Sequence, residues 1–207
     1  MEDFVSLTVH GFLDATAKRA PVPGGGAVAA LSGALSSAMA RMVAAYSIGK
    51  NTPDEIRPKV EAVNKRLKRA DCLFRALVTQ DAEAYAAMTT AAEARRTESE
   101  SGIKDYQEAV LAAIGVPMEM VALAADVLET LDSFKTMANR HLISDLGVAA
   151  VLADATAQTA AYSVRINLRE LGSPDLRLKI ESDLDKTLER CAAGRVSLER
   201  FVKEVLE

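Results

Sequence analysis

Three consecutive glycines, Gly24–Gly26, stand directly before a long run rich in Ala, Ser, Leu and Met. Glycine is the poorest ordinary helix former, so three at a helix start require a reason. One reason is that missing Cβ atoms let a ligand reach the first free N–H groups, at the positive end of the helix dipole. The other is a tight turn followed by close helix packing. The lysine of a P-loop is absent, which disfavours nucleotide binding.

Two polar sets could carry acid–base chemistry within otherwise apolar, helix-forming sequence. The first is Asp81 with Tyr85, one helical turn apart, which either serves a site or lies on a solvated helix face. The second is Asn139 with Ser144 and Asp145. In that set, Ser144 or Asp145 could instead cap a helix.

A third polar set, Arg165 with Asn167, falls deep inside an apolar helical run. A buried asparagine costs desolvation, so Asn167 is expected to have a hydrogen-bonding duty, either structural or functional. His141 and Asp145 are one turn apart, but no third residue has metal-ligand spacing, which disfavours a metal site. Neither G-x-S-x-G nor H-E-x-x-H occurs.

The composition indicates how such side chains would be positioned. Hydrophobic residues make up 49% of the 207 residues, but aromatic residues only 4%, and Trp is absent. An apolar content supplied largely by Ala is typical of closely packed helices rather than sandwiches or barrels. The net charge of −4 provides no basic field, so nucleic acid is not expected as a partner. Cys72 and Cys191 lie far apart without a C-x-x-C, which predicts buried thiols in a reducing compartment.

No targeting segment is evident. The N-terminal residues lack the basic and then apolar pattern of a signal peptide. The uncharged run from Val22 to Ala40 is rich in small residues and is followed at once by Arg41, so a membrane span is not predicted there. We therefore expect a cytoplasmic protein without a membrane partner.

Apolar residues recur at three- and four-residue spacing nearly throughout, which predicts helices. The expected ranges are 4–20, 24 or 25 to 49, 54–96, 103–134, 141–171, 175–193 and 197–206. The helix over 54–96 should be the longest. Pro117 should kink or split the helix that contains it, and Gly194 should separate the last two. No linker or repeat divides the chain, so we predict a single all-α domain, 1–207, built as a bundle of long antiparallel helices.

Several short strings occur in an order that one family shares. They are Pro23–Gly26 before AVAALSGAL, Ile48–Lys50, Asp81–Tyr85, Val116-Pro117, Asn139 six residues before Asp145, SDLGVAA at 144–150, and Ile166–Leu168. On these motifs the chain resembles the formiminotransferase-cyclodeaminase C-terminal domain and its stand-alone relatives, the methenyltetrahydrofolate cyclohydrolases, over roughly residues 4–195. The segment 95–104, which is less basic than in the family, and Ser163, where family members often have Asn, depart from the pattern.

The resemblance implies an all-helical, dimeric or larger enzyme that acts on a tetrahydrofolate derivative without a metal. It leaves open a methenyltetrahydrofolate cyclohydrolase, a formiminotetrahydrofolate cyclodeaminase and a non-catalytic folate-binding protein. We expect the cyclohydrolase first, because 207 residues leave no room for an attached transferase domain.

The resemblance also implies roles for individual residues. Asp81 and Asp145 are the candidate acid–base carboxylates, and Lys50 would donate a proton or meet the anionic glutamyl tail. The implied substrate-binding residues are Pro23, Gly24, Gly25, Gly26, Tyr85, Asn139 and Asn167. We predict that Asp81, Asn139 and Asp145 converge on one pocket near the glycines, and that the protein is a homodimer.

Overall fold

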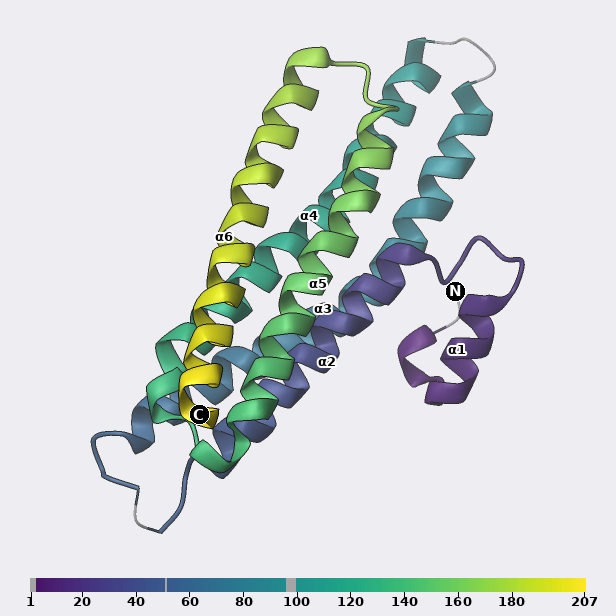
Figure 1. Cartoon of the computed structure of the whole chain (residues 1–207). Helices are drawn as coiled ribbons and strands as arrows, with labels where there is room; N and C mark the ends of the chain where they lie inside the picture. The colour runs from purple at the N-terminus through teal and green to yellow at the C-terminus, as the bar shows by residue number, and fades with distance from the viewer. Residues whose placement is uncertain (1–2, 51, 96–99) are drawn as a thin grey trace.

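The computed structural model describes residues 3–50, 52–95 and 100–207, and this part of the chain is helical without a strand. Figure 1 shows a bundle of long helices with a short helix beside it. The α-helices are α1 (Val9–Ala17), α2 (Gly25–Tyr46), α3 (Arg57–Ala94), α4 (Glu100–Phe134), α5 (Ile143–Leu168) and α6 (Pro174–Leu206). The 3-10 turns are η1 (Phe4–Ser6), η3 (Lys135–Met137) and η4 (Arg140–Leu142). The predicted all-α fold is confirmed.

Helix α2 lies between α3 and α5, and α4 packs on both α3 and α5 from the other side. Helix α6 covers α5 and α4. The predicted third long helix is confirmed as the longest described element, at 38 residues. The expected first helix is interrupted, because Thr8 begins a new helix by accepting a hydrogen bond from Gly11 N–H.

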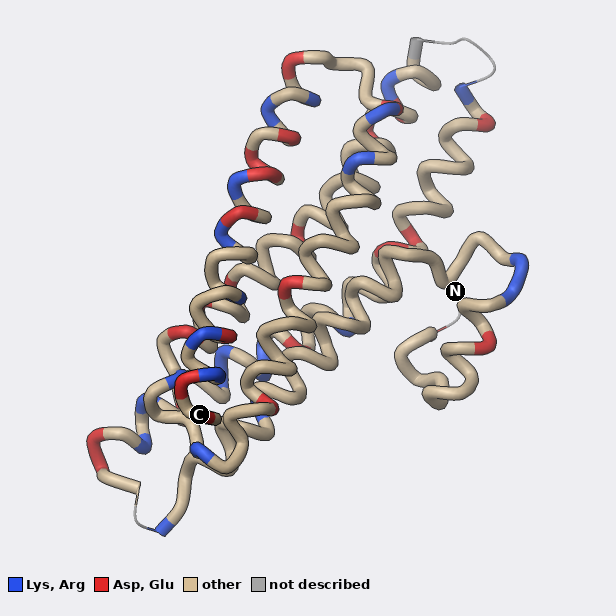
Figure 2. The backbone as a smooth tube through the Cα atoms, viewed as in Figure 1, with Lys and Arg blue, Asp and Glu red and all other residues tan. Residues whose placement is uncertain are grey.

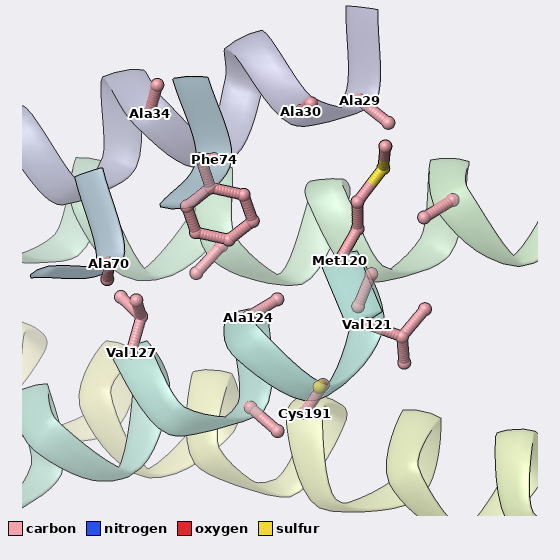
Figure 3. Packing of buried hydrophobic residues seen from close by; sticks show 14 of the residues in the cluster. Ala29, Ala30, Ala34, Ala70, Phe74, Met120, Val121, Ala124, Val127 and Cys191 are labelled. Atoms are coloured by element: carbon pink, nitrogen blue, oxygen red, sulfur yellow. The ribbon is translucent and has the colours of Figure 1, made fainter. Parts of the chain in front are cut away.

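Small residues let α2 approach its neighbours closely. The Ser36 hydroxyl donates to the Ala149 carbonyl of α5 at 2.7 Å. Gly33 lies under the ring of Phe74 on α3, where a Cβ would lie 2.5 Å from Phe74 Cδ1. Figure 3 shows this ring between the alanines of α2 and the α4 side chains. These close contacts of α2 with α3 and α5 fix the position of its first turn.

Replacing Gly33 with Ala should therefore lower the free energy of unfolding. The buried Phe74 ring must move to admit the methyl group, and overpacking of this kind costs about 1–3 kcal/mol. Gly115→Ala is the matched control, because a Cβ there meets nothing within 4 Å. Urea unfolding of both variants measures the difference. Equal stability of the two variants would contradict the close packing of Gly33 against Phe74.

Pro117 was predicted to kink or split its helix, and the split is wrong, because α4 is continuous from Glu100 to Phe134. A proline has no N–H, so it leaves the carbonyl four residues earlier, that of Ala113, without its helical donor. The side-chain amide of Asn167 on α5 donates to that carbonyl at 2.8 Å. A neighbouring helix thus completes the hydrogen bonding that the proline removes.

Two further predictions need correction. Helix α6 continues through Gly194 and is not broken there. Gly194 instead allows close packing against α4, because a Cβ there would lie 3.2 Å from the Leu128 side chain. Cys191 is buried, as predicted, and burial raises the pKa of its thiol to about 12. Cys72 is exposed, because it lies on the outer face of α3.

Two helical stretches, Gly25–Tyr46 and Ser101–Met137, are long and apolar enough by composition alone to cross a membrane. About half of each is buried inside the bundle, 56% and 50% of the most apolar window. Burial of that extent is also what the core helices of a helical bundle show.

Candidate functional site

An open pocket of about 1390 Å³ lies beside the start of α2. Its wall combines the loop before α2, the first turn of α2, the second half of α3, and facing parts of α4 and α5. The lining residues are Pro21, Val22, Gly24, Gly25, Gly26, Asp81, Ala84, Tyr85, Met88, Thr89, Ala92, Arg95, Ile103, Tyr106, Ala113, Ser163, Ile166, Asn167 and Glu170. Figure 1 shows these segments meeting where α2 begins, next to α3.

Asp81 of α3 caps the start of α2 from outside that helix. Gly24 is the N-cap residue and has no side chain that could accept a hydrogen bond. The Ala27 N–H instead donates to the Asp81 carboxylate. An ideal Cβ on Gly26 would lie 2.5 Å from Asp81 Cγ, so the carboxylate occupies the space that a side chain at this position would fill.

The glycine cluster therefore combines the two interpretations that the sequence left open. Gly26 is buried and permits close approach of Asp81. Gly25 is exposed, has nothing within 4 Å of its missing Cβ, and faces the pocket. The anion-binding end of α2 is thus occupied by the chain's own carboxylate, and Asp81 lines the pocket beside the helix start.

The environment of Asp81 suits proton transfer. Burial raises the pKa of its carboxyl above the ordinary value, and the hydrogen bond from Ala27 N–H opposes that shift. A half-buried carboxyl with a raised pKa holds its proton to higher pH than a surface aspartate, and so can act as a general acid as well as a base.

Two predicted substrate-binding residues flank Asp81 in this pocket. Tyr85, one turn further along α3, is 43% exposed and offers a ring face to a flat ligand. Asn167 also lines the pocket, although its amide N–H is engaged with Ala113. Ser163, one turn before Asn167 on α5, contributes a hydroxyl to the same wall.

The other predicted site residues lie elsewhere in the chain. The Asn139 amide donates to the Tyr46 carbonyl at 3.0 Å, and its backbone N–H donates to the Ser47 hydroxyl. These bonds place Asn139 at the far end of α2, which is about 33 Å long for its 22 residues. Exposed Lys50 follows that same end.

Asp145 lies in the first turn of α5, next to the η4 turn that Asn139 begins. The prediction that Asp81, Asn139 and Asp145 line one pocket is therefore wrong within a single chain, because α2 and α5 separate the two ends. Pro23 is buried behind the pocket-lining Val22, to which it is joined by a cis peptide bond, and does not itself line the pocket.

Sequence reasoning missed the end of the pocket furthest from Asp81. The Tyr106 hydroxyl donates to Glu170 Oε2 at 2.8 Å, and the Arg95 guanidinium carbon lies 4.2 Å from the centre of the Tyr106 ring. Burial, and then the hydrogen bond to Glu170, raise the pKa of Tyr106. The available signal was spacing: Arg95 continues the α3 face of Asp81 and Tyr85, and Glu170 comes three residues after Asn167, just past the end of α5. Residues 96–99, which belong to the segment 95–104 that differs from the family pattern, lie outside the described residues.

Within the described ranges, no group of three His, Cys, Asp or Glu side chains is placed to hold a metal ion. His141 is exposed and lies on the η4 turn, near Asp145 but away from the pocket.

Fold and pocket together define an all-helical protein with an open pocket, in which a half-buried carboxylate meets a helix start. Residues 8–186 match the formiminotransferase-cyclodeaminase family, and the chain belongs to that family. A methenyltetrahydrofolate cyclohydrolase of Methylorubrum extorquens is 31% identical over 79% of this chain and 80% of its own length.

Other relatives are named as cyclodeaminases. Formimidoyltransferase-cyclodeaminase of Mus musculus is 27% identical over 82% of this chain, which spans only 32% of that longer protein. The crystal structure of formiminotetrahydrofolate cyclodeaminase from Thermotoga maritima superimposes with a TM-score of 0.89, at 27% identity and 98% coverage of both chains.

Proposed function

We propose that this protein is a folate one-carbon enzyme, a methenyltetrahydrofolate cyclohydrolase. The observation that carries the proposal is Asp81, a half-buried carboxylate held at the start of α2 in a pocket with an aromatic and apolar wall. Support for the substrate class comes from the chain's family and from the similar Methylorubrum extorquens cyclohydrolase.

The chemistry of the reaction fits that carboxylate. Methenyltetrahydrofolate has a cationic N–C–N bridge, and its hydrolysis adds water to the bridging carbon. One carbon–nitrogen bond of the tetrahedral intermediate then breaks, the leaving nitrogen takes a proton, and the other nitrogen keeps the formyl group. Ionised Asp81 would stabilise the cation and accept a proton from the attacking water, and protonated Asp81 would return it to the leaving nitrogen.

The alternative is a formiminotetrahydrofolate cyclodeaminase, which the similarity to the Thermotoga maritima enzyme supports. In that reaction a folate nitrogen attacks the formimino carbon and ammonia leaves after protonation, so the same carboxylate would serve. An absorbance assay separates the two. Loss of the methenyl chromophore supports the cyclohydrolase, and its formation from formiminotetrahydrofolate supports the cyclodeaminase. Binding of folate without either change would favour a non-catalytic folate-binding protein.

We further propose that the enzyme is a homodimer joined through α2 and α5. The outward faces of these adjacent helices carry exposed apolar residues: Val28, Leu35, Val148, Val151 and Tyr162. Figure 2 shows long uncharged stretches on both helices, whereas α6 is densely charged. An apolar face of this kind is typical of a surface that a second subunit covers.

A twofold axis that passes near Leu35, at the middle of α2, and runs perpendicular to this helix would set its two copies antiparallel. The Gly25 end of one copy would then lie against the Tyr46 end of the other. This arrangement would carry Lys50, Asn139 and Asp145 of the second copy toward the Asp81 pocket. We therefore keep these three residues as proposed site residues, contributed from the partner.

Leu35→Asp should convert the dimer to monomer, because the twofold axis would bring two carboxylates together in an apolar interface. Leu178→Asp is the matched control, since Leu178 is 70% exposed on α6, away from this face. Light scattering at micromolar protein concentration measures the mass. A parent protein that is monomeric, or a Leu35→Asp variant that remains dimeric, would exclude this interface.

We propose residues 1–207 as one helical domain, with a cytoplasmic location and no nucleic-acid or membrane partner. The buried apolar side chains of all six α-helices belong to one cluster, which supports the single domain. Two free thiols and the negative net charge are in keeping with the location and with the absence of nucleic acid.

A further inference from the structure

The pocket is long and has chemically different ends. One face of α3 lines it with Asp81, Tyr85, Met88, Ala92 and Arg95, at helical spacing. The fourteen helical steps from Asp81 to Arg95 correspond to about 21 Å of helix. The acid–base carboxylate therefore stands at one end of the slot and a guanidinium at the other.

Arg95 is held in place by Tyr106 of α4. The Tyr106 side chain is buried, which holds its ring in place, and its hydroxyl donates to Glu170, two residues after the end of α5. Arg95 lies over the face of that ring, 4.2 Å from its centre. A guanidinium that stacks through its face keeps its in-plane N–H donors available for a carboxylate.

The charges at this end favour an anion specifically at Arg95. Among the described residues that line the pocket, Arg95 is the only basic one, and the acidic ones are Asp81 and Glu170. Glu170 meets Tyr106 at its hydroxyl, on the edge of the ring, whereas Arg95 lies on the face. Among the described residues no ion pair joins Arg95 to Glu170, and Glu170 Oε2 already accepts the Tyr106 hydroxyl.

Between the two ends the wall is apolar. Met88 and Ala92 of α3 face this stretch, together with Ile103 of α4 and Ile166 of α5. Such a wall suits an aromatic linker with a polar group at each end.

We propose that Arg95 binds the glutamyl carboxylate of the folate, with Tyr106 as the positioning residue that holds the guanidinium. This inference rests on the proposed function, because it takes a reduced folate as the ligand and Asp81 as the end where its one-carbon bridge lies. The bicyclic head then occupies the Gly25–Asp81 end, the aminobenzoyl ring lies against the apolar wall, and the tail reaches Arg95. Arg95 thereby takes over, within one chain, the tail contact first predicted for Lys50.

The test compares two substrates, methenyltetrahydrofolate and methenyltetrahydropteroate, which lacks the glutamate. Arg95→Met should lower kcat/KM about 10- to 100-fold for the first, as expected for the loss of a charge-assisted hydrogen-bonded pair, and leave it unchanged for the second. The loss should lie in KM, with kcat retained. Arg169→Met is the control, because Arg169 is exposed near the same end but does not line the pocket.

Variants at Tyr106 test whether this residue positions the Arg95 guanidinium or is needed only for the fold. Tyr106→Phe keeps the ring under Arg95 and should keep most of the preference for the glutamate-bearing substrate, whereas Tyr106→Leu should lose it. Circular dichroism of each variant checks the helical content. An equal loss on both substrates in Arg95→Met would overturn the inference and leave the proposed function standing.

Direct binding makes the test independent of turnover. Calorimetry with 5-formyltetrahydrofolate and 5-formyltetrahydropteroate should show tail-dependent affinity in the parent protein and in Arg169→Met, but not in Arg95→Met. Tail-dependent binding without turnover would support the tail site and count against the proposed function. Absence of binding by either compound would overturn both.

Discussion

Asp81→Asn should lower turnover of the folate substrate by about 10²–10⁴-fold, which is the usual loss when general acid–base catalysis is removed. Asparagine keeps the shape of the side chain, and its carbonyl oxygen can still accept the hydrogen bond from Ala27 N–H. What it cannot do is hold and release the proton. Steady-state rates with the methenyl or formimino substrate, alongside circular dichroism, measure the effect.

Glu83→Gln is the matched control for Asp81→Asn. Glu83 lies two residues further along α3, is exposed, and does not line the pocket, so the same change in charge should leave turnover within about threefold of the parent. Burial raises the pKa of Asp81, so the acidic limb of the parent's pH–rate profile should lie above the range of an exposed aspartate. That limb should vanish in Asp81→Asn.

Asp145→Asn tests the second candidate carboxylate. If Asp145 reaches the pocket from a partner subunit, its variant should also lose activity, and mixing it with Asp81→Asn protein should restore part of the rate in hybrid dimers. If both single variants turn over the substrate within about threefold of the parent, the assignment of the carboxylate is wrong. The fold and the family would be untouched by that result.

Gly26→Ala should reduce turnover by about 100-fold or more, although no titratable group is changed. The new Cβ would lie 2.5 Å from Asp81 Cγ, so the carboxylate must leave its place at the start of α2. Displacement of a catalytic group by about 1 Å can cost 10²-fold in rate. The hydrogen bond from Ala27 N–H should be lost at the same time.

Gly33→Ala separates this effect from a loss of stability. It introduces the same methyl group into the same helix and also meets a buried side chain, Phe74, but away from the pocket. Under conditions in which both variants are folded, Gly33→Ala should retain turnover and Gly26→Ala should not. Similar rates for the two would mean that Gly26 serves only the packing of α2.

Local pattern alone determined the helical fold and its longest element. The three- and four-residue apolar spacing and the Ala-rich composition require helices that pack closely, whatever their order in space. The same local reasoning selected Asp81, Tyr85 and Asn167 and left open whether each had a functional or a structural duty. Local rules erred at Pro117 and Gly194, because the side chains that let a helix continue there come from other helices.

Only the tertiary structure decided what each polar group meets. Asn167 finds the carbonyl freed by Pro117 because α5 lies beside α4, and Asp81 reaches the start of α2 because Gly26 has no side chain in its way. Asn139 lies at the opposite end of α2 from Asp81, which no motif spacing could indicate. The physical reason is that helical periodicity fixes which face a residue occupies, whereas its partners depend on which helices adjoin that face and on their register.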